Sequence, residues 1–164
     1  MLDPNIQDNL DKTHRTIRIL WIAIMASLGI MLVVAHAITE QAGQNPEVQA
    51  ILRYPLMAAA VLILLAVPMV RRFLLKSGAE TAKSMRDSTA KFNVLAARYT
   101  SAVIVSMALC ESVTILGFFL YVLGGDMPTF YIFLAASVVG MYAYRPRREP
   151  LEELAKIASG QMPF

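Results

Sequence analysis

The chain has 164 residues, of which 57% are hydrophobic and only 16% are charged, well below the roughly 25% of charged residues in an average soluble protein. The apolar residues fall in four blocks, each long enough to cross a bilayer, whereas a soluble domain would spread them periodically. The net charge of +3 does not point to nucleic acid, because the basic residues flank the apolar blocks, where lipid headgroups would meet them.

These apolar blocks predict an all-α, polytopic membrane protein that forms a single domain over residues 1–164. Four transmembrane helices are expected, over residues 17–38, 53–70, 99–124 and 129–144. The connection over 71–98 and the tail over 145–164 are expected in the cytoplasm, each with an amphipathic helix. The expected surroundings are therefore a lipid bilayer, in a bacterial inner membrane or its equivalent.

The N-terminal half contains two of these spans and the turn between them. Asp3 and Pro4 are typical of a helix start, so a short interfacial helix is expected before the first span, with a frayed terminus as the alternative. Gly43 and Pro46 are turn signals in the linker over 39–49. Pro68, near the end of the second span, is a place where that helix could bend.

The connection over 71–98 predicts a helix of its own. Ser77 and Glu80 have the spacing of a capping box, in which both side chains satisfy the first amide groups of a helix. After them, residues recur at steps of three and four, as expected for one face of a membrane-surface helix that runs into the third span: Met85, Thr89, Phe92, Ala96 and Tyr99.

Turn signals and aromatic residues delimit the last two elements. The sequence from Gly124 to Pro128 predicts a tight turn between the third and fourth spans. Aromatic residues at both ends of the fourth span are expected as interface anchors: Phe130, Tyr131, Tyr142 and Tyr144. The tail predicts a short helix over 150–159 that ends at Gly160.

The basic residues predict the orientation of the chain. Fourteen of the 15 Lys and Arg residues lie in residues 1–18, 71–98 and 145–164, and only Arg53 lies on the other side of the expected spans. The positive-inside rule therefore places both termini in the cytoplasm. Five arginines beside the spans are expected to set this topology and to contact lipid headgroups: Arg71, Arg72, Arg145, Arg147 and Arg148.

One ionisable residue, Glu111, lies inside the third span, 13 residues from Arg98 and 13 from Gly124. That position predicts a carboxyl group near the bilayer midplane, where the charged form is disfavoured and a functional role is the default hypothesis. An adjacent face of the same helix carries small residues at four-residue steps, a pattern that favours close helix packing: Ala102, Ser106, Cys110 and Thr114.

Two interpretations of Glu111 remain open from the sequence. In one it loads and releases a proton or cation, and in the other it makes an interhelical hydrogen bond or ion pair. The candidate members of this polar site are its helix neighbours and two residues of other spans: Cys110, Ser112, Thr114, Arg53 and His36. Helix hydroxyls often bond to their own backbone carbonyls, which weakens the case for the serine and the threonine.

The residues around the acid resemble a known family. Ala108-Leu109-Cys110-Glu111-Ser112, followed by Ile115-Leu116-Gly117, is similar to the carboxylate helix of the rotary ATPase proteolipid (subunit c) family. The resemblance covers about 18 residues and implies that Glu111 carries a translocated proton or sodium ion. The second span lacks the regular glycines of that family's partner helix, and about 28 residues replace its short polar loop.

Two functions are therefore predicted. The first is a small integral membrane subunit that assembles with itself or with a larger membrane complex through the Glu111 helix. The alternative is a proton- or cation-coupled membrane protein in which Glu111 titrates during transport. The sequence contains no nucleophile–base pair, paired acids or metal-ligand motif, and its single cysteine cannot form an internal disulfide. No enzyme activity, metal, cofactor or nucleic-acid partner is expected.

Overall fold

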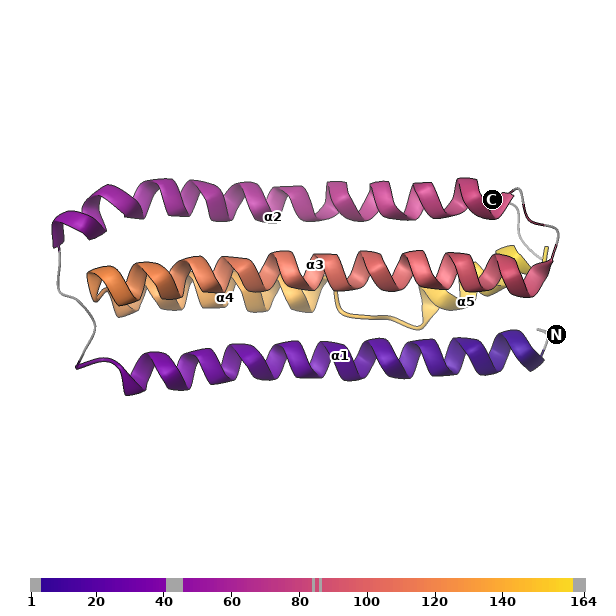
Figure 1. Cartoon of the computed structure of the whole chain (residues 1–164), viewed down its shortest axis with the longest axis horizontal. Coiled ribbons are helices and arrows are strands. Elements are labelled where there is room, and N and C mark those ends of the chain that lie inside the picture. The colour runs from indigo at the N-terminus through magenta and orange to yellow at the C-terminus, as the bar shows by residue number, and fades with distance from the viewer. Residues whose placement is uncertain (1–3, 41–45, 84, 86, 161–164) are drawn as a thin grey trace. The chain divides into compact units, whose positions relative to one another are not determined.

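The computed structural model describes residues 4–40, 46–83, 85 and 87–160. Its helices are α1 (Pro4–Ala37), α2 (Pro46–Lys83), α3 (Ser88–Gly124), α4 (Met127–Ala143) and α5 (Glu149–Ala158), as Figure 1 shows. The described part of the chain contains no strand, which confirms the all-α prediction. Three stretches have the length and composition to cross a membrane, Ile6–Ala37, Ala50–Ala82 and Ser88–Gly124, and α4 is a shorter apolar helix of 17 residues.

The helices extend beyond the predicted spans. Helix α1 runs unbroken from Pro4 to Ala37, so the described N-terminal segment and most of the predicted first span belong to one helix. Its predicted cap, Asp3, and the part of the linker that contains Gly43 (residues 41–45) lie outside the described residues. Both Pro55 and Pro68 lie inside α2, and helix α2 begins within the predicted linker, at Pro46.

The predicted helix start at Ser77 is wrong, because Ser77 and Glu80 lie inside α2. The connection instead consists of the C-terminal part of α2 and the N-terminal part of α3, and residues 84–87 lie between the two helices. Asp87 caps α3, since its two carboxylate oxygens accept hydrogen bonds from the amides of Thr89 and Ala90, each at 3.2 Å. The capping-box spacing therefore lies within a continuing helix.

A close helix contact accompanies this continuation of α2. A Cβ atom added to Gly78 would lie 2.8 Å from the Cβ and Cγ atoms of Arg98, so only glycine lets α2 and α3 approach so closely there. The turns predicted from glycines agree with the structure: Gly125 and Gly160 both have positive φ, 71° and 74°, and α5 ends just before Gly160.

The chain divides into two compact units, and each contains parts of several helices. Unit 1 comprises residues 1–21, 69–105 and 145–164. Its buried side chains repeat at helical spacing on α1, α3 and α5: Ile6, Leu10 and Ile17; Phe92, Leu95 and Tyr99; Leu151, Ala155 and Ala158. The Tyr99 hydroxyl donates to the Arg147 carbonyl oxygen (3.3 Å), and Asn9 donates to Asn93 (3.4 Å).

Unit 2 comprises residues 22–68 and 106–144. The described residues of this unit form apolar core clusters that include Leu28, Val67, Cys110 and Met141; Ala35, Tyr121 and Phe130; Ala60, Val113 and Phe133. From the Leu28 cluster to the Ala35 cluster, residue numbers rise on α1 and α3 and fall on α4, so α1 and α3 run parallel and α4 runs antiparallel to them. From the Val67 cluster to the Ala60 cluster, residue numbers fall on α2 while they rise on α3, so α2 is also antiparallel to α3. The four helix segments of this unit therefore have an up-down-up-down arrangement.

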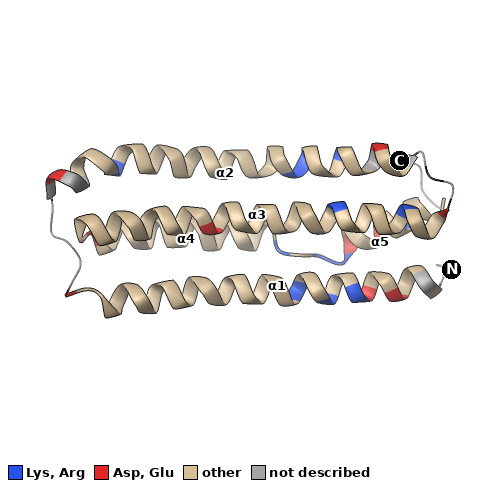
Figure 2. Cartoon of the chain, in the orientation of Figure 1, with Lys and Arg blue, Asp and Glu red and all other residues tan. Residues whose placement is uncertain are grey.

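The two units differ in their content of basic residues. Unit 1 contains 14 of the 15 Lys and Arg residues and unit 2 contains only Arg53, and Figure 2 shows how sparse the blue segments are along the stretches of unit 2. At about 1.5 Å per residue, the α3 and α4 segments of unit 2 are about 25–29 Å long. That length is close to the ~30 Å hydrocarbon core of a bilayer.

Candidate functional site

Glu111 of α3 makes its hydrogen bond to a residue that the sequence did not indicate. Ser27 of α1 donates its hydroxyl hydrogen to Glu111 Oε1, and both side chains are half-buried. Their neighbours in sequence, Leu28 and Cys110, pack together in one core cluster of unit 2. This apolar contact holds the two helices side by side, so that Ser27 and Glu111 meet at the same level.

The predicted neighbours of Glu111 on α3 have other surroundings. Ser112 donates to the carbonyl oxygen of Leu109 in its own helix, at 2.7 Å, so its hydroxyl is already satisfied. Cys110 is fully buried in the core cluster. Thr114 is also fully buried, and its hydroxyl has no hydrogen-bond partner among the described residues. Of the three, Thr114 alone offers an uncommitted polar atom.

The predicted packing residues Ala102, Ser106, Cys110 and Thr114 are all buried. Within unit 2, α3 meets α4 at two very close contacts, one at Cys110 of this set and one at Gly117. A Cβ atom on Gly140 would lie 2.9 Å from the Cys110 sulfur, and one on Gly117 would overlap Phe133. The two helices therefore approach closely where one partner in each pair is glycine.

A second hydroxyl without a partner lies at the same level of α4. Ser137 is fully buried and, like Thr114, has no hydrogen-bond partner among the described residues. Ser137 lies between Phe133 and Gly140, the α4 members of the two close contacts, and Thr114 lies between their α3 members. The antiparallel register thus brings the two hydroxyls to about the same height in the α3–α4 interface.

Two predicted partners of Glu111 lie at other levels of unit 2. His36 is nine residues beyond Ser27, about 13 Å along α1. Its Nδ1 lies 3.2 Å from the Leu32 carbonyl oxygen and its Nε2 3.4 Å from the Tyr131 hydroxyl. Arg53 is exposed and is seven residues, about 10 Å, from Ala60 along α2. The structure does not bring either residue to Glu111.

Helix α2 gives the depth of the Glu111 level. Val67 belongs to the same cluster as Cys110. Along the helix it is about 6 Å from Arg71 and about 21 Å from Arg53. Leu64 of α2 packs against the same cluster, so the part of α2 at the Glu111 level lies between these two arginines.

The arginines predicted to contact lipid headgroups all belong to unit 1. One of them, Arg148, makes ion pairs with Asp11 (3.0 Å) and Glu152 (2.9 Å) at a half-exposed position. Arg147 accepts the Tyr99 hydrogen bond through its carbonyl oxygen, which leaves its side chain out of that contact. Both residues therefore also have structural contacts within unit 1.

Sequence reasoning missed Ser27 and Ser137. Ser27 had a usable signal, because it is the only hydroxyl residue between Thr16 and Thr39 in an otherwise apolar run. Ser137 had a weaker sequence signal, since α4 also contains Thr129.

In the described ranges, no three His, Cys, Asp or Glu side chains lie close enough to hold a metal ion. Comparison with protein-family models, curated proteins and solved structures gives no match to the chain.

Proposed function

We propose that the chain is a small integral membrane subunit with four spans and cytoplasmic termini, which assembles with itself or with a larger membrane complex. Three apolar helices of sufficient length and the apolar α4 support the membrane location. The concentration of basic residues in unit 1 supports the orientation, because Lys and Arg remain on the cytoplasmic side of most membrane proteins.

The second carboxyl oxygen of Glu111 carries the proposal of assembly. Ser27 occupies Oε1, whereas Oε2 has no hydrogen bond to any residue in the described part of the chain. The Glu111 side chain is only half-buried, so part of it is open to the surroundings of the chain. An unsatisfied polar group in hydrocarbon costs several kcal/mol, and a hydrogen bond to a polar group of another subunit that can both donate and accept, such as a hydroxyl, would remove that cost.

Two substitutions at Glu111 test assembly. Glu111→Gln keeps an oxygen that accepts from Ser27 and adds an amide for a neighbouring subunit, so its assembly should match that of the original chain. Glu111→Leu removes all of these hydrogen bonds and should release monomers. Mass measurement in mild detergent reports the assembly state. Ser101→Ala is the control, because Ser101 is exposed and bonds only to Ala97 of its own helix.

The original chain should run as an oligomer or with a companion protein. A strictly monomeric original chain in lipid nanodiscs would contradict the proposal, and so would unchanged assembly of the Glu111→Leu variant.

A second function, coupling to protons or cations, is favoured by the two hydroxyls without partners. Thr114 is three residues from Glu111 on α3, and Ser137 lies at about the same height on α4. Together with Ser27 they gather four polar side chains at neighbouring levels of an apolar unit. Buried polar groups in a membrane favour a water or ion pathway, and the resemblance around Glu111 implies the same role.

Proton flux into liposomes that contain the purified chain tests this alternative. Glu111→Gln should assemble normally but abolish the flux, because an amide cannot release a proton. Ser137→Ala should reduce the flux if the α3–α4 hydroxyls belong to the pathway. Equal flux through the original chain and the Glu111→Gln variant would reject coupling while leaving the assembly proposal intact.

A further inference from the structure

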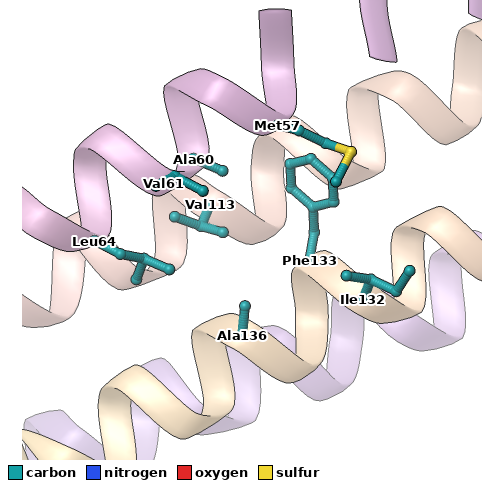
Figure 3. Close-up of a pocket in the computed structure, with 8 residues that line it drawn as sticks. All are labelled: Met57, Ala60, Val61, Leu64, Val113, Ile132, Phe133 and Ala136. Atoms are coloured by element: carbon teal, nitrogen blue, oxygen red, sulfur yellow. The ribbon is translucent and has the colours of Figure 1, made fainter. Parts of the chain in front are cut away.

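An apolar groove opens on unit 2 between α2 and α4, with α3 as its floor. Its volume is about 100 Å³, and every residue that lines it is apolar: Met57, Ala60, Val61, Leu64, Val113, Ile132, Phe133 and Ala136. Figure 3 shows the α2 residues on one side and the α4 residues on the other, with Val113 behind them. The small side chains of Ala60 on α2 and Ala136 on α4 leave space between these two helices.

The size of the groove favours a lipid chain over a protein helix as its occupant. An α-helix is about 10 Å across with its side chains, far too wide for a groove of about 100 Å³. Apolar hollows of this size exclude water and take up small apolar groups. In a bilayer the apolar groups available at this depth are acyl chains, whose flexible methylene groups can follow a narrow path.

One basic residue continues the line of the groove. Arg53 precedes Met57 by four residues, so it lies one helical turn beyond the groove on the same stripe of α2 as Met57, Ala60 and Leu64. Its side chain is exposed, and it is the only Lys or Arg in unit 2. A guanidinium group binds phosphate oxygens through paired hydrogen bonds, which gives this end of the groove a complementary charge.

The dimensions of α2 agree with a bound lipid. Arg53 lies 18 residues from Arg71, about 27 Å along the helix, close to the ~30 Å hydrocarbon thickness. Arg53 is therefore at headgroup height, beside the exposed Tyr54, an aromatic residue typical of that level. From Arg53 to Leu64 the helix rises about 16 Å, about the depth of one leaflet.

We propose that this groove binds one acyl chain of a glycerophospholipid whose phosphate is held by Arg53. The lipid belongs to the leaflet at the Arg53 end of the apolar part of α2. The inference rests on the membrane location proposed above but not on any role of Glu111. Arg53, which the sequence suggested as a partner of Glu111, thus has a lipid phosphate as its partner in this proposal.

The test titrates dioleoyl phosphatidylglycerol into the detergent-purified full chain and counts bound lipids by native mass spectrometry. Ala136→Leu fills the groove and should remove the tightest-binding lipid. Ala135→Leu makes the same change at the neighbouring, exposed position of α4 and should leave binding unchanged. Arg53→Gln keeps most of the side-chain length without the charge and should weaken that lipid about tenfold. Circular dichroism shows whether each variant keeps its helix content.

Equal lipid binding by the Ala136→Leu and Ala135→Leu variants would overturn the groove site. Unchanged affinity of the Arg53→Gln variant would overturn the phosphate contact. If Ala136→Leu abolished self-association and left lipid binding intact, the groove would be a contact between copies and the lipid proposal would be wrong. The Glu111→Gln variant should bind the lipid normally, so a failed assembly experiment and a failed lipid experiment are separable.

Discussion

The hydrogen bond between Ser27 and Glu111 can be used to measure the charge of the acid. Ser27→Ala removes the donor and leaves Glu111 Oε1 without its partner from α1. Interhelical hydrogen bonds between neutral groups in membrane proteins average about 0.6 kcal/mol and reach about 1.7. Hydrogen bonds to charged groups contribute about 1.5–3 kcal/mol. We therefore expect Ser27→Ala to destabilise the chain by about 1 kcal/mol if the acid is neutral and by about 1.5–3 kcal/mol if it is charged.

A double-mutant cycle sharpens this prediction. Glu111→Gln keeps a neutral acceptor for the Ser27 hydroxyl. If Glu111 is protonated, Ser27→Ala should therefore cost about as much in the glutamine background as in the original chain. If Glu111 is charged, the cost should fall by about 1 kcal/mol or more in the glutamine background. Reversible unfolding in mixed micelles, followed by circular dichroism, gives the four free energies of unfolding.

Ser112→Ala is the matched control for this cycle. Ser112 is adjacent to Glu111 but bonds only to the Leu109 carbonyl of its own helix, so its removal should change the free energy of unfolding by less than about 0.5 kcal/mol. A Ser27→Ala variant as stable as the control would refute the contact. So would a coupling of zero when Ser27→Ala is combined with Glu111→Leu.

Three further predictions concern packing, capping and orientation. Gly117→Ala should destabilise unit 2 by about 1–3 kcal/mol, because its new Cβ would overlap Phe133; Gly29→Ala, with open space around it, should be neutral or stabilising in the same unfolding assay. Asp87→Ala should cost about 1 kcal/mol and speed amide hydrogen exchange at the start of α3, and unchanged exchange there would contradict the cap. Lys156→Cys should react with a membrane-impermeant maleimide only after cells are opened, whereas labelling of intact cells would reverse the proposed orientation.

Local signals predicted the elements whose ends depend on a single residue. Gly160 ends α5 because glycine adopts positive φ without strain, and this property can be read from the sequence. The pair Ser77 and Glu80 gave a false helix start, since its spacing also fits a continuing helix. The close approach of Gly78 to Arg98, which accompanies that continuation, is a tertiary contact between residues 20 positions apart.

In the candidate site, too, one feature could be predicted from local sequence and another depends on tertiary packing. Glu111 could be identified from the sequence, because a lone acid in an apolar run of that length is unusual. Its partner could not, because the packing of Leu28 against Cys110 decides which α1 residue meets it. His36 and Arg53 were reasonable candidates by charge alone, but the helix register places them about 10 Å or more along their helices from the core residues near Glu111.

The 17 residues of α4 also bear on the kind of membrane that suits the chain. At 1.5 Å per residue α4 reaches about 26 Å, a few ångströms less than a typical ~30 Å hydrocarbon core. Lipids around a short span must compress, at a cost of a fraction of a kcal/mol for each ångström of mismatch. If α4 crosses the bilayer as proposed, bilayers of shorter-chain lipids would hold this protein with the least distortion, and differences in thickness would favour the thinner membranes.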